Sequence, residues 1–296
     1  MKNVLSFVKD IPVLLRTYIS PQFLQDIHQL IVVKNKRITG SFPVEVHVTE
    51  HCNLNCKGCN HFSCLAEEEY LEVERFEKDF KRLAELSKDF YDIKILGGEP
   101  LLHPRITEFF DIARKYFPST SIQVTTNGLL LAKQPPEFWL NCRKNSIKVF
   151  ISQYPVKLNK KEIEKIAGKN RVKIVYRGTT AKERMCKMPL DLTGGQDMKK
   201  SYQKCAISWG CCVTLREGRI YTCCFAAHIK FFNEYFKQNL IVGDDDFIDI
   251  YKVNNRKEII DFLEKPFPFC RYCKSSQIKF AQRWDVTKKE ITEWID

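Results

Sequence analysis

The chain has 296 residues, of which 44% are hydrophobic, enough to bury the core of one large domain with a smaller appendage. Lysine and arginine outnumber aspartate and glutamate by 48 to 36, but the basic residues are spread along the sequence. This pattern indicates a solvated basic surface and disfavours a nucleic-acid-binding protein. No stretch approaches about 18 consecutive apolar residues, so no transmembrane segment is expected, and the short N-terminal apolar runs do not form a secretion signal.

Residues 1–41 are predicted to form a helical extension of one or two amphipathic basic helices, with Pro12 and Pro21 as breakers. The pattern then changes, because residues 43–50 alternate as a strand does, and a cysteine-rich loop follows directly. Residues 71–90 show the apolar spacing of a helix.

Strands and helices alternate from residue 93 onward. Strands are expected at 93–98, 121–128, 147–153 and 172–178, and helices at 106–117, 138–144 and 160–168. This order predicts a parallel sheet with right-handed crossovers. Five strands before residue 180, with room for a sixth, are too few for a closed eight-stranded barrel. We therefore expect an α/β fold with a partial (β/α)6 TIM-like barrel at 42–190.

The alternation fails after about residue 180. A basic connection follows, and cysteines dominate the segment from residue 205 to residue 273. Two short strands are predicted on either side of Glu217 and Gly218, and a helix is predicted at 257–264. Residues 191–296 are expected to form a small C-terminal domain and a polar tail.

Cys52, Cys56 and Cys59 form a C-x3-C-x2-C arrangement in the loop after the first predicted strand. Without a secretion signal the chain is expected in the reducing cytoplasm, where clustered cysteines more often bind metal than form disulfides. A structural zinc site normally needs four ligands, and Cys64 or His61 could supply the fourth. A [4Fe–4S] cluster held by three thiolates instead leaves one iron free to bind a substrate.

Gly97, Gly98, Glu99 and Pro100 follow about forty residues later, at the end of the second predicted strand. Ligands of parallel α/β sheets bind at this edge. The two glycines would let the backbone approach a ligand closely, and Glu99 could pair with an ammonium group. Alone the motif could be a tight turn, but behind the cysteine loop it predicts a ligand site.

The two motifs together resemble those of the radical S-adenosylmethionine (SAM) superfamily, and the resemblance covers roughly residues 42–180. It implies that the free iron binds the amino and carboxylate groups of SAM. It also implies that the motif around Glu99 binds the amino group, and that reductive cleavage yields a 5′-deoxyadenosyl radical that abstracts hydrogen. One position departs from the family, since Gly58 stands where many members carry an aromatic residue near the adenine. Phe62 or His61 could take over that packing.

Three polar residues at later strand ends are candidates for further contacts with SAM. Asn127, Ser152 and Arg177 lie where the family commonly draws its ribose and carboxylate contacts. A polar residue at the exit of a strand can equally be a simple cap, so both interpretations stay open.

A second group of cysteines follows the predicted barrel. Its members are Cys205, Cys211, Cys212, Cys223, Cys224, Cys270 and Cys273. This segment resembles the auxiliary-cluster domain called twitch, which is related to the larger SPASM domain. The resemblance implies that Cys205, Cys223, Cys270 and Cys273 hold one auxiliary [4Fe–4S] cluster, with Cys211 and Cys224 as alternative ligands. The spacing alone also permits a four-cysteine zinc ribbon, and Cys212 could simply be buried.

Three cysteines lie outside both groups. Cys142 falls on a predicted helix and is expected to pack in the core. Cys64 and Cys186 fall near the expected active edge of the barrel, so either could donate a hydrogen atom to a substrate radical.

The substrate is less well determined than the cofactors. The cysteine loop and the strand after it most resemble uncharacterised radical SAM proteins of bacterial polysaccharide loci. This resemblance favours dehydrogenation or epimerisation of a saccharide or phosphorylated sugar, with flavodoxin or ferredoxin as electron donor. A peptide-modifying maturase is the first alternative. A non-enzymatic iron–sulfur or zinc protein that binds nucleic acid is the second, and its affinity should fall steeply with salt.

Overall fold

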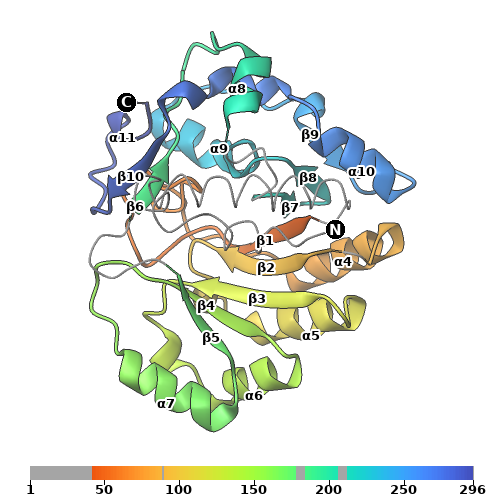
Figure 1. Cartoon of the computed structure of the whole chain (residues 1–296), viewed down its shortest axis with the longest axis vertical. Helices are drawn as coiled ribbons and strands as arrows, with labels where there is room; N and C mark the ends of the chain where they lie inside the picture. Colours follow the sequence, from red (N-terminus) through yellow and green to blue (C-terminus); the bar gives the residue numbers. More distant parts are fainter. Residues whose placement is uncertain (1–41, 89, 178–183, 206–211, 296) are drawn as a thin grey trace, which may run out of the picture.

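Eight strands form one sheet in the order β5-β4-β3-β2-β1-β7-β8-β9 (Figure 1). The structure is a computed structural model, and it describes residues 42–88, 90–177, 184–205 and 212–295. The helical extension expected at 1–41 lies outside the described residues. No helix among the residues described is both long enough and apolar enough to cross a membrane.

The first five strands run parallel and alternate with helices. The strands are β1 (Pro43–Thr49), β2 (Asp92–Gly97), β3 (Ser121–Thr126), β4 (Lys148–Ser152) and β5 (Ile174–Arg177). The helices between them are α4 (Val73–Leu86), α5 (Ile106–Tyr116), α6 (Pro136–Lys144) and α7 (Lys160–Asn170). Figure 1 shows these helices together on the outer side of the sheet. This is the parallel arrangement that alternating strands and helices predict.

The C-terminal half extends the same sheet from the free edge of β1. Strand β7 (Thr214–Arg216) pairs in parallel with β1, and β8 (Arg219–Tyr221) and β9 (Phe247–Asp249) continue in antiparallel order. A two-residue turn joins β7 to β8, and both Glu217 and Gly218 have the positive φ that such hairpin turns need.

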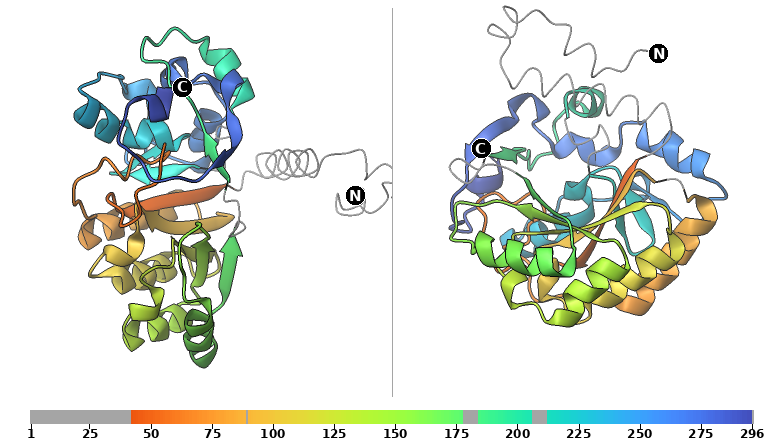
Figure 2. Two further views of the ribbon diagram at one scale, coloured as in Figure 1. Left: turned by 90° about the vertical axis from the view of Figure 1, so that its left-hand side faces the viewer. Right: turned by 60° about the horizontal axis from the view of Figure 1, so that its bottom comes forward.

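The remaining elements lie beyond the sheet (Figure 2). They are β6 (Arg184–Lys187), α8 (Met198–Lys204), α9 (Cys224–Phe236), α10 (Arg256–Leu263), β10 (Lys279–Arg283) and α11 (Thr292–Ile295). Strand β6 pairs with β10 in a separate two-stranded sheet. The α/β partial barrel is therefore confirmed, with five parallel strands, while the sixth strand after them joins the C-terminal tail.

Two apolar cores hold these elements together. The first lies between the parallel sheet and α4 to α7, where Phe76, Phe80 and Phe109 are fully buried. The second joins Phe225, Phe232 and other C-terminal side chains to Phe62, which follows the cysteine loop. Strand β7 packs in the first core, and residues that follow the cysteine loop pack in the second, so both cores cross the boundary expected at residue 190. The division into 42–190 and 191–296 stays a prediction.

The end of β2 packs directly on the backbone that precedes the cysteine loop. A Cβ atom on Gly97 would lie 2.2 Å from the carbonyl oxygen of Thr49, and one on Gly98 would lie 2.0 Å from that of His51. The backbone hydrogen bond from Glu99 N–H to the His51 carbonyl, 3.1 Å long, needs this approach. The two glycines thus allow backbone to meet backbone, where the sequence alone suggested an approach to a ligand.

Replacing Gly98 by alanine is therefore expected to lower the free energy of unfolding by about 1–3 kcal/mol, because the new Cβ has no room beside rigid backbone. Gly168→Ala is the matched control, since Gly168 lies in α7 with no atom within 4 Å of an added Cβ. Alanine there should raise the stability by roughly 0.5–1 kcal/mol. Urea unfolding of the metal-free protein measures both, and equal effects at the two sites would contradict the packing argument.

Candidate active site at the carboxyl ends of the parallel strands

One pocket collects most of the residues that the sequence predicts for the site. It is lined by the cysteine loop after β1 and by residues at or near the ends of β2, β3, β4 and β5. The predicted residues in its wall are Cys52, Cys56, Cys59, Gly97, Gly98, Asn127, Ser152 and Arg177. Because the carboxyl ends of parallel strands meet at one edge, residues far apart in sequence share this space.

The sulfur atoms of the loop receive hydrogen bonds from nitrogen donors. Leu54 N–H donates to Cys52 Sγ at 3.3 Å, and Trp284 Nε1–H donates to Cys56 Sγ at 3.1 Å. Burial raises the pKa of all three thiols, that of Cys56 to about 12, so the metal-free thiols are protonated. A soft, sulfur-only donor set selects zinc or iron–sulfur centres. Hydrogen bonds to sulfur are among the contacts that tune iron–sulfur clusters, and the loop therefore fits such a cluster.

The C-terminal tail closes over the cysteine loop. Lys57 N–H donates to the Asp285 carbonyl at 2.9 Å, and Thr287 N–H donates to the Asn55 carbonyl at 3.0 Å. Trp294 Nε1–H donates to the carbonyl of Cys59 at 3.0 Å. This role could not be predicted from the sequence, because the polar tail carries no motif and lies more than two hundred residues away in the chain.

The tail explains why position 58 departs from the family pattern. Gly58 has φ +63°, and a Cβ there would lie 2.9 Å from the carbonyl oxygen of Glu293. Of the two residues expected to replace the missing aromatic side chain, His61 lines the pocket. Phe62 is fully buried and packs on Phe225 in the second core.

Glu99 is buried behind the pocket wall. Its Oε1 accepts hydrogen bonds from Thr126 Oγ1 at 2.6 Å and from Leu101 N–H at 3.2 Å, while Oε2 accepts from Asn127 N–H at 2.9 Å. Burial raises its pKa to about 7 against these hydrogen bonds. Pro100 begins a short 3-10 helix and is buried. Binding of SAM by Glu99 and Pro100 stays a prediction, and the contacts seen tie the end of β2 to the end of β3.

Asn127, Ser152 and Arg177 all reach the pocket wall. Asn127 Nδ2 donates to Asn53 Oδ1 at 2.7 Å, which connects the end of β3 to the cysteine loop. The Arg177 guanidinium lies over the ring of Phe150, 4.9 Å from its centre. The position of the three residues suits contacts with a ligand, and their roles stay predictions.

Polar side chains from inside the sheet complete the pocket, and sequence reasoning missed them. Lys94 Nζ lies 2.6 Å from Glu45 Oε1, and Cys212 lines the same wall. Burial raises the pKa of Glu45 to about 8, although Lys94 opposes the shift. The available signal was the alternation in β1, since Glu45 shares a strand face with His47, and both are buried.

Four cysteines of the second group lie together in the second apolar core. Cys205, Cys223, Cys270 and Cys273 are all buried. Burial, with the nearby thiols Cys223 and Cys205, raises the pKa of Cys270 to about 12, and the same neighbours act on Cys273. The four predicted ligands are thus neighbours in space, in a donor set that fits an iron–sulfur cluster or zinc. The twitch domain and its cluster stay predictions.

The alternative ligands and the other cysteines are placed as follows. Cys224 is buried and hydrogen-bonds with Cys212 and Cys223. Cys211 lies outside the described residues, as does the side chain of Cys186. Cys64 is buried near Cys59 and Cys56, but the pocket lining does not include it. The hydrogen-donor role of Cys64 and Cys186 stays a prediction, while the packing of Cys142 in the first core is confirmed.

Comparison with known proteins gives partial matches that include GTP 3′,8-cyclases. GTP 3′,8-cyclase of Chlorobaculum tepidum is 36% identical over 91 residues, which are 31% of this chain and 27% of that protein. The GTP 3′,8-cyclase of Aliarcobacter butzleri is 30% identical over 138 residues, 46% of this chain and 41% of that protein. The chain thus spans less than half the length of the relatives it matches.

A solved structure shares the fold over a longer stretch. The crystal structure of BtrN in complex with AdoMet and 2-DOIA has a TM-score of 0.51 and 18% identity, and covers 79% of this chain and 93% of that one. The sequence profile described as the radical SAM superfamily matches residues 46–153, which contain the cysteine loop and the strand ends of the pocket. Residues 46–153 therefore form a radical SAM domain.

Proposed function

We propose that this protein holds a [4Fe–4S] cluster at Cys52, Cys56 and Cys59 and cleaves SAM reductively to abstract hydrogen from a small polar substrate. One observation carries the proposal: a single pocket is lined by all three cysteines and by the polar ends of the neighbouring strands. When bound, the cluster supplies a low-potential electron and an iron with an open position.

The residues of the pocket divide into those for SAM and those for the substrate. Asn127, Ser152 and Arg177 lie at strand ends beside the cysteine loop and are proposed to contact SAM. Glu99 fixes Asn127 through the backbone hydrogen bond of 2.9 Å, so its carboxylate is proposed to position the SAM site even where it does not touch SAM. The N–H donors of Leu54 and Trp284 favour the thiolate form that a cluster requires.

The substrate is proposed to be a hydroxyl-bearing small molecule, such as a sugar that carries a phosphate or a nucleotide. The Glu45–Lys94 ion pair lies in the pocket, where its fixed charges can bind hydroxyl groups. Lys94 and Arg177 offer positive charge to a phosphate. Burial raises the pKa of Glu45 to about 8, so above that pH its carboxylate is proposed to take a proton from a substrate hydroxyl.

Oxidation of an alcohol also requires an electron acceptor. The group of Cys205, Cys223, Cys270 and Cys273 is where this chain could hold one, as an auxiliary [4Fe–4S] cluster. The partial similarity to GTP 3′,8-cyclases keeps a different radical reaction on a nucleotide as the second candidate. Flavodoxin or ferredoxin is the proposed external electron donor, and the cytoplasm is the proposed location.

Anaerobic incubation of the reconstituted protein with SAM and dithionite is expected to release 5′-deoxyadenosine. Cys56→Ala should reduce this release to background, because the cluster loses one of three ligands. Cys142→Ala, which removes a core cysteine outside both groups, is the control and should stay active. Equal release by wild type and Cys56→Ala would show that the loop does not hold the reactive cluster.

Iron analysis tests the second cysteine group independently. We expect about eight iron atoms per chain in the wild type and about four in a Cys270→Ala/Cys273→Ala variant, because one four-iron cluster is lost. The variant should still cleave SAM. Four iron atoms and one zinc ion per chain in the wild type would show that the second cysteine group forms a zinc ribbon and holds no auxiliary cluster.

Deuterium transfer identifies the substrate class. The wild type, given a metabolite extract from cells grown on deuterated glucose, is expected to form deuterated 5′-deoxyadenosine with the small-molecule fraction. Lys94→Met should lower the deuterated product by roughly tenfold or more, since the partly buried, charged hydrogen bond from Lys94 to Glu45 is lost. Unlabelled 5′-deoxyadenosine should persist in the variant. Deuterium that comes only from a peptide fraction would favour a peptide-modifying maturase instead.

A further inference from the structure

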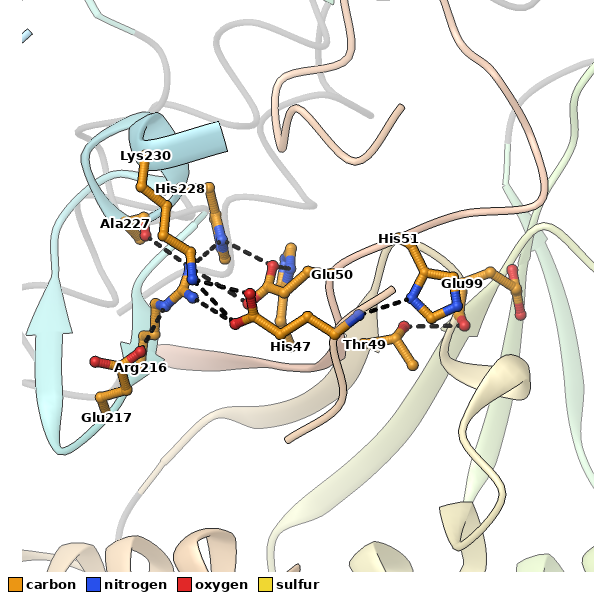
Figure 3. Close-up of polar contacts among 11 residues, drawn as sticks. His47, Thr49, Glu50, His51, Glu99, Arg216, Glu217, Ala227, His228 and Lys230 are labelled. Atoms are coloured by element: carbon orange, nitrogen blue, oxygen red, sulfur yellow. Dashed lines mark hydrogen bonds and ion pairs between the residues drawn. The ribbon is translucent and has the colours of Figure 1, made fainter. Parts of the chain in front are cut away.

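A buried polar network joins the radical SAM domain to the C-terminal half beside the cysteine loop (Figure 3). His47 Nδ1 and His228 Nδ1 each lie 3.2 Å from Oε2 of Glu50, and Arg216 Nη1 lies 3.3 Å from Oε1. The two histidine rings are stacked with their centres 3.9 Å apart. His47, Glu50 and His228 are buried, and the Arg216 side chain is 10% exposed. We call these four residues the Glu50 clamp.

The clamp is continuous with further ion pairs between the two halves. Arg216 at the end of β7 also binds Glu69 at 3.2 Å, and Lys230 of α9 binds Glu69 at 3.0 Å. Glu50 and Glu69 both belong to the radical SAM domain, while Arg216 and Lys230 belong to the C-terminal half. Arg216 Nε also lies 3.4 Å from Oε1 of Glu217 in its own half, so three carboxylates and two cations meet at this contact.

The same geometry could suggest a metal site. The ligand atoms of His47, Glu50 and His228 all lie within 4.8 Å of one another. The two spacings of 3.2 Å are close to the ~3.3 Å edge of a tetrahedral zinc site. Arg216, however, already neutralises Glu50, and it lies 3.1 Å from His228 Nδ1, where a dication would face its guanidinium. The positive charge of Arg216 beside both Glu50 and His228 disfavours a bound dication and favours a closed network without metal.

The clamp touches the cysteine loop at both of its ends. Glu50 precedes Cys52 by two residues, and its N–H donates to the Glu69 carbonyl at 3.1 Å. His61, two residues after Cys59, rests edge-on against the His47 ring with the ring centres 4.6 Å apart. Any movement of Arg216 or His228 would therefore reach both ends of the segment that carries the three thiols.

We propose that Arg216 and His228 are positioning residues, through which the C-terminal half sets the conformation of the cysteine loop. This inference rests on the proposed cluster at Cys52, Cys56 and Cys59, but it concerns a contact that exists without the cluster. If Arg216 and His228 position the loop, SAM cleavage at Cys52, Cys56 and Cys59 requires that the C-terminal half, which carries the second cysteine group, is folded.

Hydrogen–deuterium exchange of the cluster-free protein tests the contact directly. In Arg216→Gln, peptides covering residues 50–64 should exchange about tenfold faster than in the wild type, because Glu50 loses its charged partner. Arg82→Gln is the matched control, since Arg82 of α4 also joins the two halves, at the carbonyls of Ile250 and Val253, but away from the loop. Its effect should be confined to those contacts.

A paired substitution separates the clamp from general loss of folding. Glu50→Gln/Arg216→Gln removes both charges and leaves two amides that can hydrogen-bond, so exchange at residues 50–64 should return toward the wild-type rate. The His228→Phe variant should resemble Arg216→Gln, since it also removes a contact to Glu50.

The reconstituted variants give the second readout. With iron content unchanged, Arg216→Gln should alter the electron paramagnetic resonance spectrum of the reduced first cluster and slow SAM cleavage by about 10–100-fold. Arg82→Gln should leave both unchanged. If Arg216→Gln matches Arg82→Gln in exchange and in spectrum, the positioning role is wrong. Stoichiometric zinc bound in the wild type and lost in His228→Phe would overturn the metal-free network.

A wild type that forms no cluster at the loop would instead refute the proposed function. That result would leave the exchange comparison between Arg216→Gln and Arg82→Gln intact, so the two failures are distinguishable.

Discussion

The close contact between the end of β2 and the backbone before the cysteine loop is the constraint on which the rest of the site depends. Without side chains, Gly97 and Gly98 let β2 reach the carbonyls of Thr49 and His51, at distances that no Cβ could share. Glu99 then follows into a fully buried position and accepts hydrogen bonds from both Thr126 and Asn127. The ends of β1, β2 and β3 are thereby fixed to one another around the pocket.

The other contacts that hold the loop come from the C-terminal half of the chain. Trp284 and Trp294 donate hydrogen bonds to Cys56 and Cys59, and Arg216 binds Glu50. The cysteine loop belongs to the radical SAM domain and is contacted by both parts of the protein. In physical terms, a loop with few apolar side chains acquires a defined shape because its backbone and thiols are satisfied from both sides.

Much of the fold follows from local sequence pattern. The strand expected at 93–98 is β2 at Asp92–Gly97, and the helix expected at 160–168 is α7 at Lys160–Asn170. These elements could be predicted because hydrophobic periodicity is a local property. The three loop cysteines and the two glycines at the end of β2 were also predictable, since each motif is contiguous in sequence and reaches the same pocket wall.

The contacts that complete the site could not be predicted in this way. Trp284 and Cys56 are 228 residues apart, and no periodic pattern connects them. The pairing of β7 with β1 brings Cys212 to the pocket and Arg216 to Glu50, and it depends on which strand covers the free sheet edge. In the sequence, Lys94 and Glu45 are two charged residues in separate predicted strands. Only the parallel pairing of β1 with β2 places them opposite one another.

The central claim is that the cluster held by Cys52, Cys56 and Cys59 keeps one iron open for SAM. Electron–nuclear double resonance of the reduced Cys270→Ala/Cys273→Ala protein, with SAM isotopically labelled at its amino nitrogen, tests this directly. The account predicts a hyperfine coupling between the labelled nitrogen and the remaining cluster. Bound SAM without any such coupling would contradict it.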